Sequence, residues 1–141
     1  MNLIESLRKY ILTCPLLQEF SRLNVEFLPE DPDTYSVEQI PAQTVLSTYL
    51  DGSSERQFVF VFASRFSYSN EVRNNIENSG FYENFADWLE QNSDADILPE
   101  MDPGKVPSRI EAMSNAYLYE INGNQQNARY QIQCRLVYDQ Q

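Results

Sequence analysis

Three groups of acidic residues are the first candidates for chemistry in this sequence. They contain Glu30, Asp31 and Asp33; Asp94 and Asp96; and Glu100 and Asp102. Paired carboxylates can hydrolyse glycosidic bonds or bind Mg²⁺ and Ca²⁺ through their oxygens. All three groups fall in proline-rich or polar segments, and the spacing across residues 94–102 differs from that of an EF-hand loop. We therefore expect solvated loop acids, and keep a small carboxylate- or metal-dependent enzyme as an alternative.

Histidine is absent, and this excludes several kinds of active site. The Ser–His–Asp and Cys–His systems both need a histidine as the general base. Gly80, Gly104 and Gly123 do not have the spacing of a phosphate-binding loop. We predict a protein that is not an enzyme, with no catalytic residue, no metal site and no cofactor.

Four arginines lie in or next to predicted strands: Arg56, Arg65, Arg129 and Arg135. The simpler interpretation of Arg65 is that it reaches solvent at the end of its strand. The alternative is an ion pair with an acid of a neighbouring subunit, since arginine is favoured at interfaces. We take all four arginines as candidate residues of a subunit or partner interface.

The most strand-like segment is residues 57–68, QFVFVFASRFSY. Its phenylalanines at positions 58, 60, 62 and 66 point to one face, and Val59, Val61 and Ala63 point to the other. A strand that is apolar on both faces is buried on both. We expect a helix to cover one face, and either more of the chain or a neighbouring subunit to cover the other.

The segments before this strand predict one helix and three short strands. Residues 2–13 have an apolar helical stripe, with Asn2 and Glu5 placed as in a capping box. Strands are predicted at residues 23–27, 35–40 and 44–50. The turn at residues 51–54 should join the last of these to the central strand as a hairpin.

A helical pattern beginning at Ser69 or Asn70 follows the central strand, and it shifts phase at Ser79-Gly80. Ile76 and Phe81 of the apolar stripe are five residues apart, so we expect a break or kink there, giving a helix pair or one bent helix. The second helix, residues 81–91, should cover the phenylalanine face. Its aromatic residues, among them Trp88, suggest core packing more than a ligand cage.

The last part of the chain predicts two long strands. A loop is expected at residues 92–107 and a strand at 109–121, in which Ile110 and Leu118 should share an apolar face. A turn from Asn122 and a strand at 128–138 should follow. The sequence thus predicts one α+β domain over residues 1–141. It should contain a mainly antiparallel sheet, with the N-terminal helix and the central helix pair packed on it.

The charge balance limits the partners of this chain of 141 residues. It has 21 acidic and 10 basic residues, for a net charge of −11, and no cluster of Lys and Arg that would bind nucleic acid. No apolar run is long enough to span a membrane, and no signal-peptide layout is present, so we expect a cytosolic protein. Cys14 and Cys134 suggest no particular disulfide.

Two segments resemble a family of minor capsid (minor structural) proteins from phages and prophages of Gram-positive bacteria. The first, residues 49–91, contains the motifs DGSS-RQ-F and NIENSGFYE-FA-W, and the second, residues 128–140, contains RYQIQCRL-Y. The order of elements in this family is similar to that of the tail terminators of long-tailed phages. The resemblance therefore implies a tail-terminator-like α+β subunit that forms a hexameric ring.

The resemblance also implies a role in the virion, assembled in the host cytoplasm. Such a ring caps the tail tube, stops its polymerisation and contacts the head–tail connector, while DNA passes through without sequence recognition. The family has no catalytic residues. Another neck or head-completion protein of the virion is the closest alternative. An acetyltransferase is the weakest alternative, because that chemistry in its best-known form needs a histidine.

Overall fold

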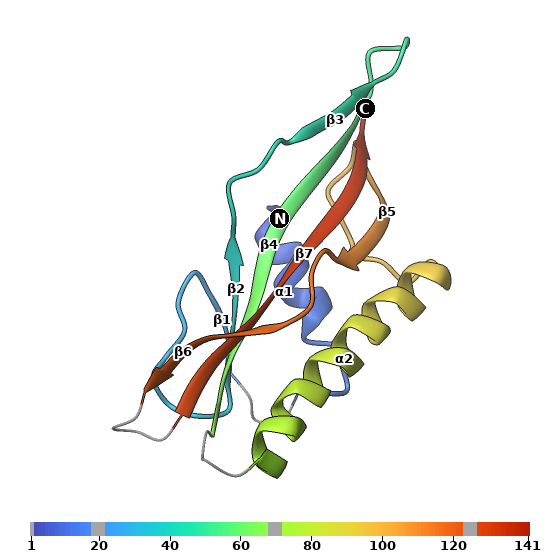
Figure 1. The fold of residues 1–141 in the computed structure, drawn as a ribbon. Coiled ribbons are helices and arrows are strands. Elements are labelled where there is room, and N and C mark those ends of the chain that lie inside the picture. The colour runs from blue at the N-terminus through green and yellow to red at the C-terminus, as the bar shows by residue number, and fades with distance from the viewer. Residues whose placement is uncertain (1, 18–21, 68–71, 123–126) are drawn as a thin grey trace.

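The computed structural model describes residues 2–17, 22–67, 72–122 and 127–141, and side-chain positions are not described for residues 72–75 and 122. Within these residues the chain forms two helices and a seven-stranded sheet (Figure 1). The elements are, in order, α1 (Leu3–Ile11), β1 (Arg22–Val25), β2 (Thr34–Gln39), β3 (Val45–Thr48), β4 (Ser54–Ser67), α2 (Val72–Asp94), β5 (Lys105–Ala112), β6 (Tyr117–Asn122) and β7 (Asn127–Gln140).

Two long antiparallel strands, β4 and β7, form the centre of the sheet. They pair over their whole length, from Ser54 opposite Gln140 to Ser67 opposite Asn127. On the free side of β4, β3 pairs with its beginning and β2 with its second half, and β1 pairs with β2. On the free side of β7 lie β5 and β6. All pairs except β1–β2 are antiparallel, which confirms the predicted α+β class and mainly antiparallel sheet.

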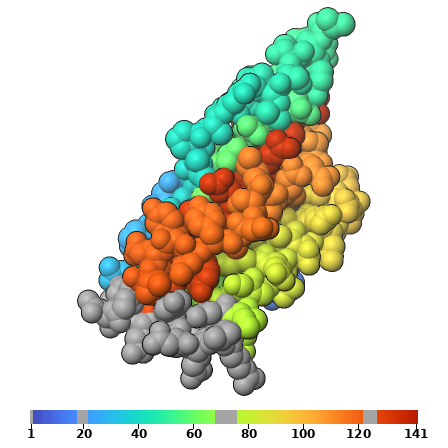
Figure 2. Space-filling view, in the orientation of Figure 1, coloured from blue at the N-terminus to red at the C-terminus, as the bar shows by residue number. Residues whose placement is uncertain are grey.

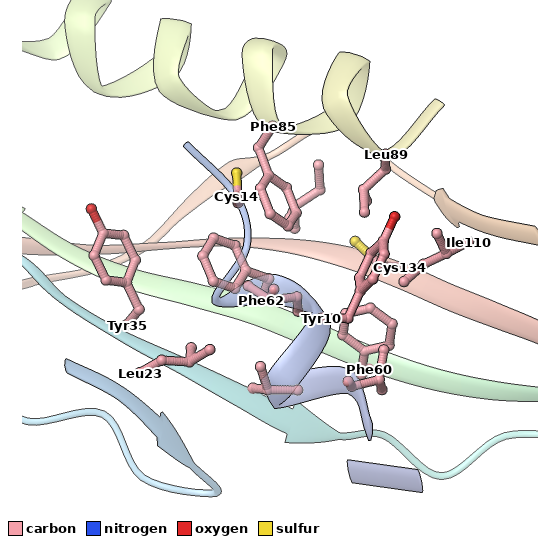
Figure 3. Packing of buried hydrophobic residues seen from close by; sticks show 14 of the residues in the cluster. Tyr10, Cys14, Leu23, Tyr35, Phe60, Phe62, Phe85, Leu89, Ile110 and Cys134 are labelled. Atoms are coloured by element: carbon pink, nitrogen blue, oxygen red, sulfur yellow. The ribbon is translucent and has the colours of Figure 1, made fainter. Parts of the chain in front are cut away.

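Both helices contribute to the core on one face of the sheet, which we call the helix face. The even-numbered phenylalanines of β4 point to this face, as the alternation predicted, and the ring of Phe62 stacks on Phe85 of α2 with centroids 4.3 Å apart. From α1, Leu7 and Ile11 are fully buried in the same cluster. Figure 3 shows Phe62 and Phe85 within it. The N-terminal helix begins as predicted, because the Asn2 side chain accepts a hydrogen bond from the Glu5 amide at 2.9 Å.

The predicted break at Ser79-Gly80 is wrong, because α2 is one continuous helix of 23 residues. The phase shift came from counting Ile76 as a core residue, whereas its side chain is 63% exposed. The core stripe of α2 contains Tyr82, Phe85 and Leu89, whose spacing fits a single helix. The predicted start at Ser69 or Asn70 lies outside the described residues.

The predicted strand over residues 109–121 is also wrong, since two separate strands occupy this region. β5 starts earlier, at Lys105, and ends at Ala112, while β6 starts at Tyr117. Ser114 and Asn115 lie between them, and the amide of Gln133 on β7 instead faces the Ser114 hydroxyl at 3.4 Å. The two strands therefore pair with different halves of β7, and the expected turn after Asn122 is outside the described residues.

The second face of β4 is covered by the same chain, so a neighbouring subunit is not required to bury it. Leu28, in the segment between β1 and β2, packs against Val61 and Ala63, and Ile40 adds to this small cluster. A hydrogen bond from Arg65 Nε to the carbonyl of Pro29, at 2.9 Å, holds the segment containing Leu28 against the sheet. The sequence left open whether more of the chain or a neighbouring subunit covers this face, and in the structure the chain itself covers it.

The first predicted strand is shorter in the structure than the sequence indicated. In the strand predicted at residues 23–27, Leu23 is buried, but β1 ends at Val25 and Phe27 is 64% exposed.

Cys14 and Cys134 are both buried and free. No helix among the described residues is long and apolar enough to cross a membrane.

Candidate functional site

The candidate acids do not converge into a site. Glu30, Asp31 and Asp33 lie in the segment before β2, and the other two groups begin with the last residue of α2 and continue into the loop after it. Six of the seven side chains are exposed, and Asp102 is half-buried. Among the described residues, no group of three or more Cys, Asp or Glu side chains is placed to hold a metal ion. The geometry therefore offers no support for a carboxylate- or metal-dependent enzyme.

An open cleft of about 800 Å³ lies between the first turn of α1 and the segment that links β2 to β3. Apolar side chains of Ile4, Ile40 and Phe58 form part of its wall. Among its lining residues, Asp102 and Lys105 carry the charges. One carboxylate and one amine do not make the pair of acids that glycoside hydrolysis uses.

The aromatic residues of α2 form core and not a ligand cage. Tyr82 is 1% exposed, and its hydroxyl shares a hydrogen bond with Ser64 and donates to the Tyr130 carbonyl at 3.0 Å. This burial raises the pKa of the Tyr82 hydroxyl far above its ordinary value. Trp88 is half-buried and lies 5.2 Å from the ring of Tyr10 of α1. The packing prediction for these rings is confirmed.

Three of the four candidate arginines share one face of the sheet, opposite the helix face. Arg65, Arg129 and Arg135 occupy odd positions on β4 and β7 and point to this side, which we call the polar face. Arg56 is at an even position, on the helix face, where its Nε donates to the Ser54 hydroxyl at 2.9 Å. The structure therefore places three of these residues on one face, with Arg65 and Arg129 adjacent and Arg135 farther along the strands, and the fourth on the other face. Their role in an interface stays a prediction.

The interpretation of Arg65 as a solvent-exposed residue is wrong, since it is 5% exposed. Besides its bond to the Pro29 carbonyl, its guanidinium lies 3.7 Å from the Glu120 carboxylate of β6. The ion pair that the alternative interpretation assigned to a neighbouring subunit is thus formed within the chain. The Nε bond to the Pro29 carbonyl replaces part of the lost water, whereas Nη1, the atom nearest the Glu120 carboxylate, has no hydrogen-bond partner among the described residues.

Arg129 lies directly opposite Arg65 on the neighbouring strand, a pairing of like charges that would be unfavourable alone. A second carboxylate compensates, because Arg129 Nη2 donates to Glu38 of β2 at 3.0 Å. The guanidinium also sits over the ring of Tyr119 of β6, 5.0 Å from its centroid. Side chains from β2 and β6 thereby meet above the central strands.

Arg135 belongs to a third ion-pair group at the other half of the polar face. Glu111 of β5 accepts from Arg135 Nε at 2.8 Å and from Arg109 Nε at 2.6 Å. Partial burial by itself would raise the pKa of the Glu111 carboxyl, but the two arginines outweigh it and hold this pKa below its usual value. The polar face is thus a set of internal ion pairs without the open basic surface that binds nucleic acid.

The sheet has open strand edges on both of its sides. Within the described residues, β1 and β3 lie on one side of the central pair and β5 and β6 on the other, and each pairs through one edge. The hairpin of β3 and β4 extends beyond the body of the molecule, as Figure 2 shows in teal and green. Leu50, at the tip of this hairpin, is fully exposed.

The strand β6 is the feature that the sequence did not reveal. In a single strand over residues 109–121, Leu118 was expected to share a core face with Ile110, whereas it is 42% exposed in the structure. The adjacent Ser114 and Asn115, both turn formers, were the signal that could have divided the strand.

Comparison of the sequence with models of known protein families, and with curated proteins, finds no match. The resemblance of residues 49–91 and 128–140 to phage minor capsid proteins therefore stays a prediction.

Proposed function

We propose that this protein is a structural subunit of a phage particle, which forms a ring at the tail–head junction, caps the tail tube and stops its polymerisation. The observation that supports a ring is that, among the described strands, one subunit has open sheet edges on two opposite sides. A subunit with two different edges can join copies head to tail, and such contacts close into a ring when the rotation allows it.

The resemblance to the phage family supplies the place of the ring in the virion. The segments that carry the resemblance form the turn of the β3–β4 hairpin, the strand β4, the helix α2 and the strand β7. They are thus the two central strands and the helix that pack together in the core, as expected if the resemblance extends to the fold. The tail tube protein and the head–tail connector are the proposed partners, and six copies are the proposed number.

The charge of the chain is compatible with a channel for DNA. A net charge of −11 repels the phosphate backbone, and the arginines of the polar face are already paired with acids. DNA could therefore slide past such a ring without strong binding. The proposal assigns no catalytic residue and no cofactor.

Deletion of the gene from the parent phage tests this function, with the wild-type gene supplied from a plasmid as the control. The proposal predicts headless tails of uncontrolled length, visible by negative-stain electron microscopy. Filled heads beside free tails of normal length would favour another neck or head-completion protein. Normal infectious particles would contradict a structural role in the virion.

A further inference from the structure

The outer edge of β6 has the features of a surface that pairs with another strand. β6 pairs with β7 along one edge, and no described strand pairs with the other. Four of its six side chains are large, apolar or aromatic, and between 39% and 59% exposed. These residues are Tyr117, Leu118, Tyr119 and Ile121. An edge strand of this composition is a template for strand addition.

The edge strands β5, next to β6, and β1, on the other side of the sheet, are both protected against pairing with another strand. On β5, Lys105, Pro107 and Arg109 are the residue types that prevent edge pairing, because proline lacks an amide hydrogen and charges resist burial. β1 is backed by α1, whose Arg8 donates through Nε to the Leu23 carbonyl at 2.9 Å. The sequence YLYEIN of β6 has no Pro, Lys or Arg. The edge of β6 therefore lacks the protection that β5 and β1 have.

Charge identifies which surface of a second copy can approach β6. Two copies with a net charge of −11 each repel one another, so contact is favoured where charge is lowest. The single ionisable carboxylate of β6, on Glu120, is paired with Arg65. On the opposite side of the sheet, β3 has the sequence VLST and contains no ionisable side chain.

β3 is also accessible and complementary in side-chain type. It lies on the hairpin that projects from the body (Figures 1 and 2), and its outer edge is unpaired among the described strands. Val45 is 36% exposed, and Tyr49, just beyond the strand, is 43% exposed. Aromatic residues on one strand opposite β-branched residues on the next are favourable cross-strand pairs.

We propose that β6 of one copy pairs with β3 of the next copy, so that the sheet continues from subunit to subunit. This inference rests on the proposed ring and names the surfaces that close it. Because β3 and β6 lie on opposite sides of the same sheet, every copy offers one of each and the contact repeats head to tail. Pairing of β6 with β6 would instead end at a two-fold dimer.

Cross-linking between single-cysteine additions tests the pairing directly. Ser47→Cys places a thiol on exposed β3, and Tyr119→Cys places one on exposed β6, while the native Cys14 and Cys134 are buried. A short bis-maleimide is added to purified protein and, separately, to phage particles that carry the variants. We expect dimers when the two variants are mixed, none with either alone, and a ladder of oligomers with the double variant.

Three outcomes would overturn the proposal. Dimers from Tyr119→Cys alone would show β6–β6 pairing, and dimers from Ser47→Cys alone would show pairing of two hairpins. The absence of cross-links in both the purified protein and the particles would show that neither edge is an interface. The gene deletion tests the proposed function separately. If particles without the gene are normal, the role in the virion is contradicted, but cross-links in the purified protein still show whether β6 pairs with β3.

A substitution series separates loss of pairing from loss of folding. Leu118→Lys and Ile121→Lys put a charge on the exposed β6 edge and should reduce the cross-linking yield at least tenfold. Val106→Lys is the matched control, because this exposed apolar side chain lies on the protected edge strand β5. It should leave the yield unchanged. All three variants should keep the melting temperature within a few degrees, and equal yields in all three would contradict the inference.

Discussion

Arg65, Arg129 and Arg135 show that an arginine in a strand is not by itself the mark of an interface. Each meets a carboxylate from another strand of the same chain, at distances between 2.8 and 3.7 Å. An isolated buried cation would cost several kcal/mol, so the carboxylate near Arg65, whose side chain is 7% exposed, stabilises the folded subunit whether or not a neighbour is present. The Arg135 side chain is 32% exposed and keeps part of its water. Position along a strand determines the face of each arginine, but the acids that pair with them come from distant segments.

Glu111 gives a prediction at the residue scale. Glu111→Gln should reduce the free energy of unfolding at pH 7 by about 1–2 kcal/mol, because two arginines lose a shared carboxylate. The pKa of Glu111 is lower in the folded state than in the unfolded state. Its stabilisation is therefore complete above the unfolded pKa and is lost as the pH falls through the folded pKa.

Urea denaturation of both proteins at neutral and acidic pH measures this effect. The difference in free energy between wild type and Glu111→Gln should shrink below the unfolded pKa, roughly pH 4.3. Glu83→Gln, at an exposed position of α2, is the control and should change little at either pH. A difference that does not depend on pH would contradict the assignment.

At the scale of elements, the helix α2 and the strands β5 and β6 differ from their predicted form in opposite ways. α2 is continuous where a break was expected, and one expected strand is divided in two. Both errors came from treating an exposed apolar residue, Ile76 or Leu118, as part of the core. An apolar residue on the surface is common, so periodicity counted over few residues is easily misled.

Gly80 provides the prediction for α2. It lies inside the helix at an ordinary backbone conformation, and a Cβ added there meets no atom within 4 Å. Gly80→Ala should therefore increase the free energy of unfolding by about 0.5–1 kcal/mol, since glycine is a poor helix former.

Thermal denaturation compares Gly80→Ala with a second glycine in a different conformation. Gly52, in the turn of the β3–β4 hairpin, has φ of 90°, so Gly52→Ala should be destabilising. A loss of stability in Gly80→Ala would indicate that the helix is interrupted near this residue after all.

At the scale of the whole molecule, the proposed ring must overcome strong repulsion between its subunits. Each copy carries a net charge of −11, and the contact proposed between β3 and β6 is almost free of charge. Apolar burial and strand pairing would supply the attraction, while the remaining surface opposes it.

Assembly should consequently become stronger as salt screens this repulsion. Between roughly 20 and 300 mM NaCl, the weight-average mass measured by analytical ultracentrifugation should increase for the wild-type protein. Leu118→Lys is the control and should sediment as a smaller species throughout. Weaker association at high salt would indicate that ion pairs between subunits hold the ring together, contrary to the proposed contact.

Most elements and the layout of the core followed from local patterns in the sequence. The alternation in β4 and β7, the stripe of α1 and the second half of α2 each have a strong period that fits one structure, because burial of one face determines which residues must be apolar. The α+β class and the hairpins could be predicted for the same reason.

The partners of the polar side chains and the state of the edges were decided by the tertiary structure. Nothing near Arg65 in the chain indicates that Pro29 and Glu120 will surround it, since these contacts join three distant segments. The cover over Val61 and Ala63 likewise depends on where the segment with Leu28 crosses the sheet. Whether Leu118 is buried depends on which half of β7 its strand pairs with, and such long-range pairing leaves no local period in the sequence.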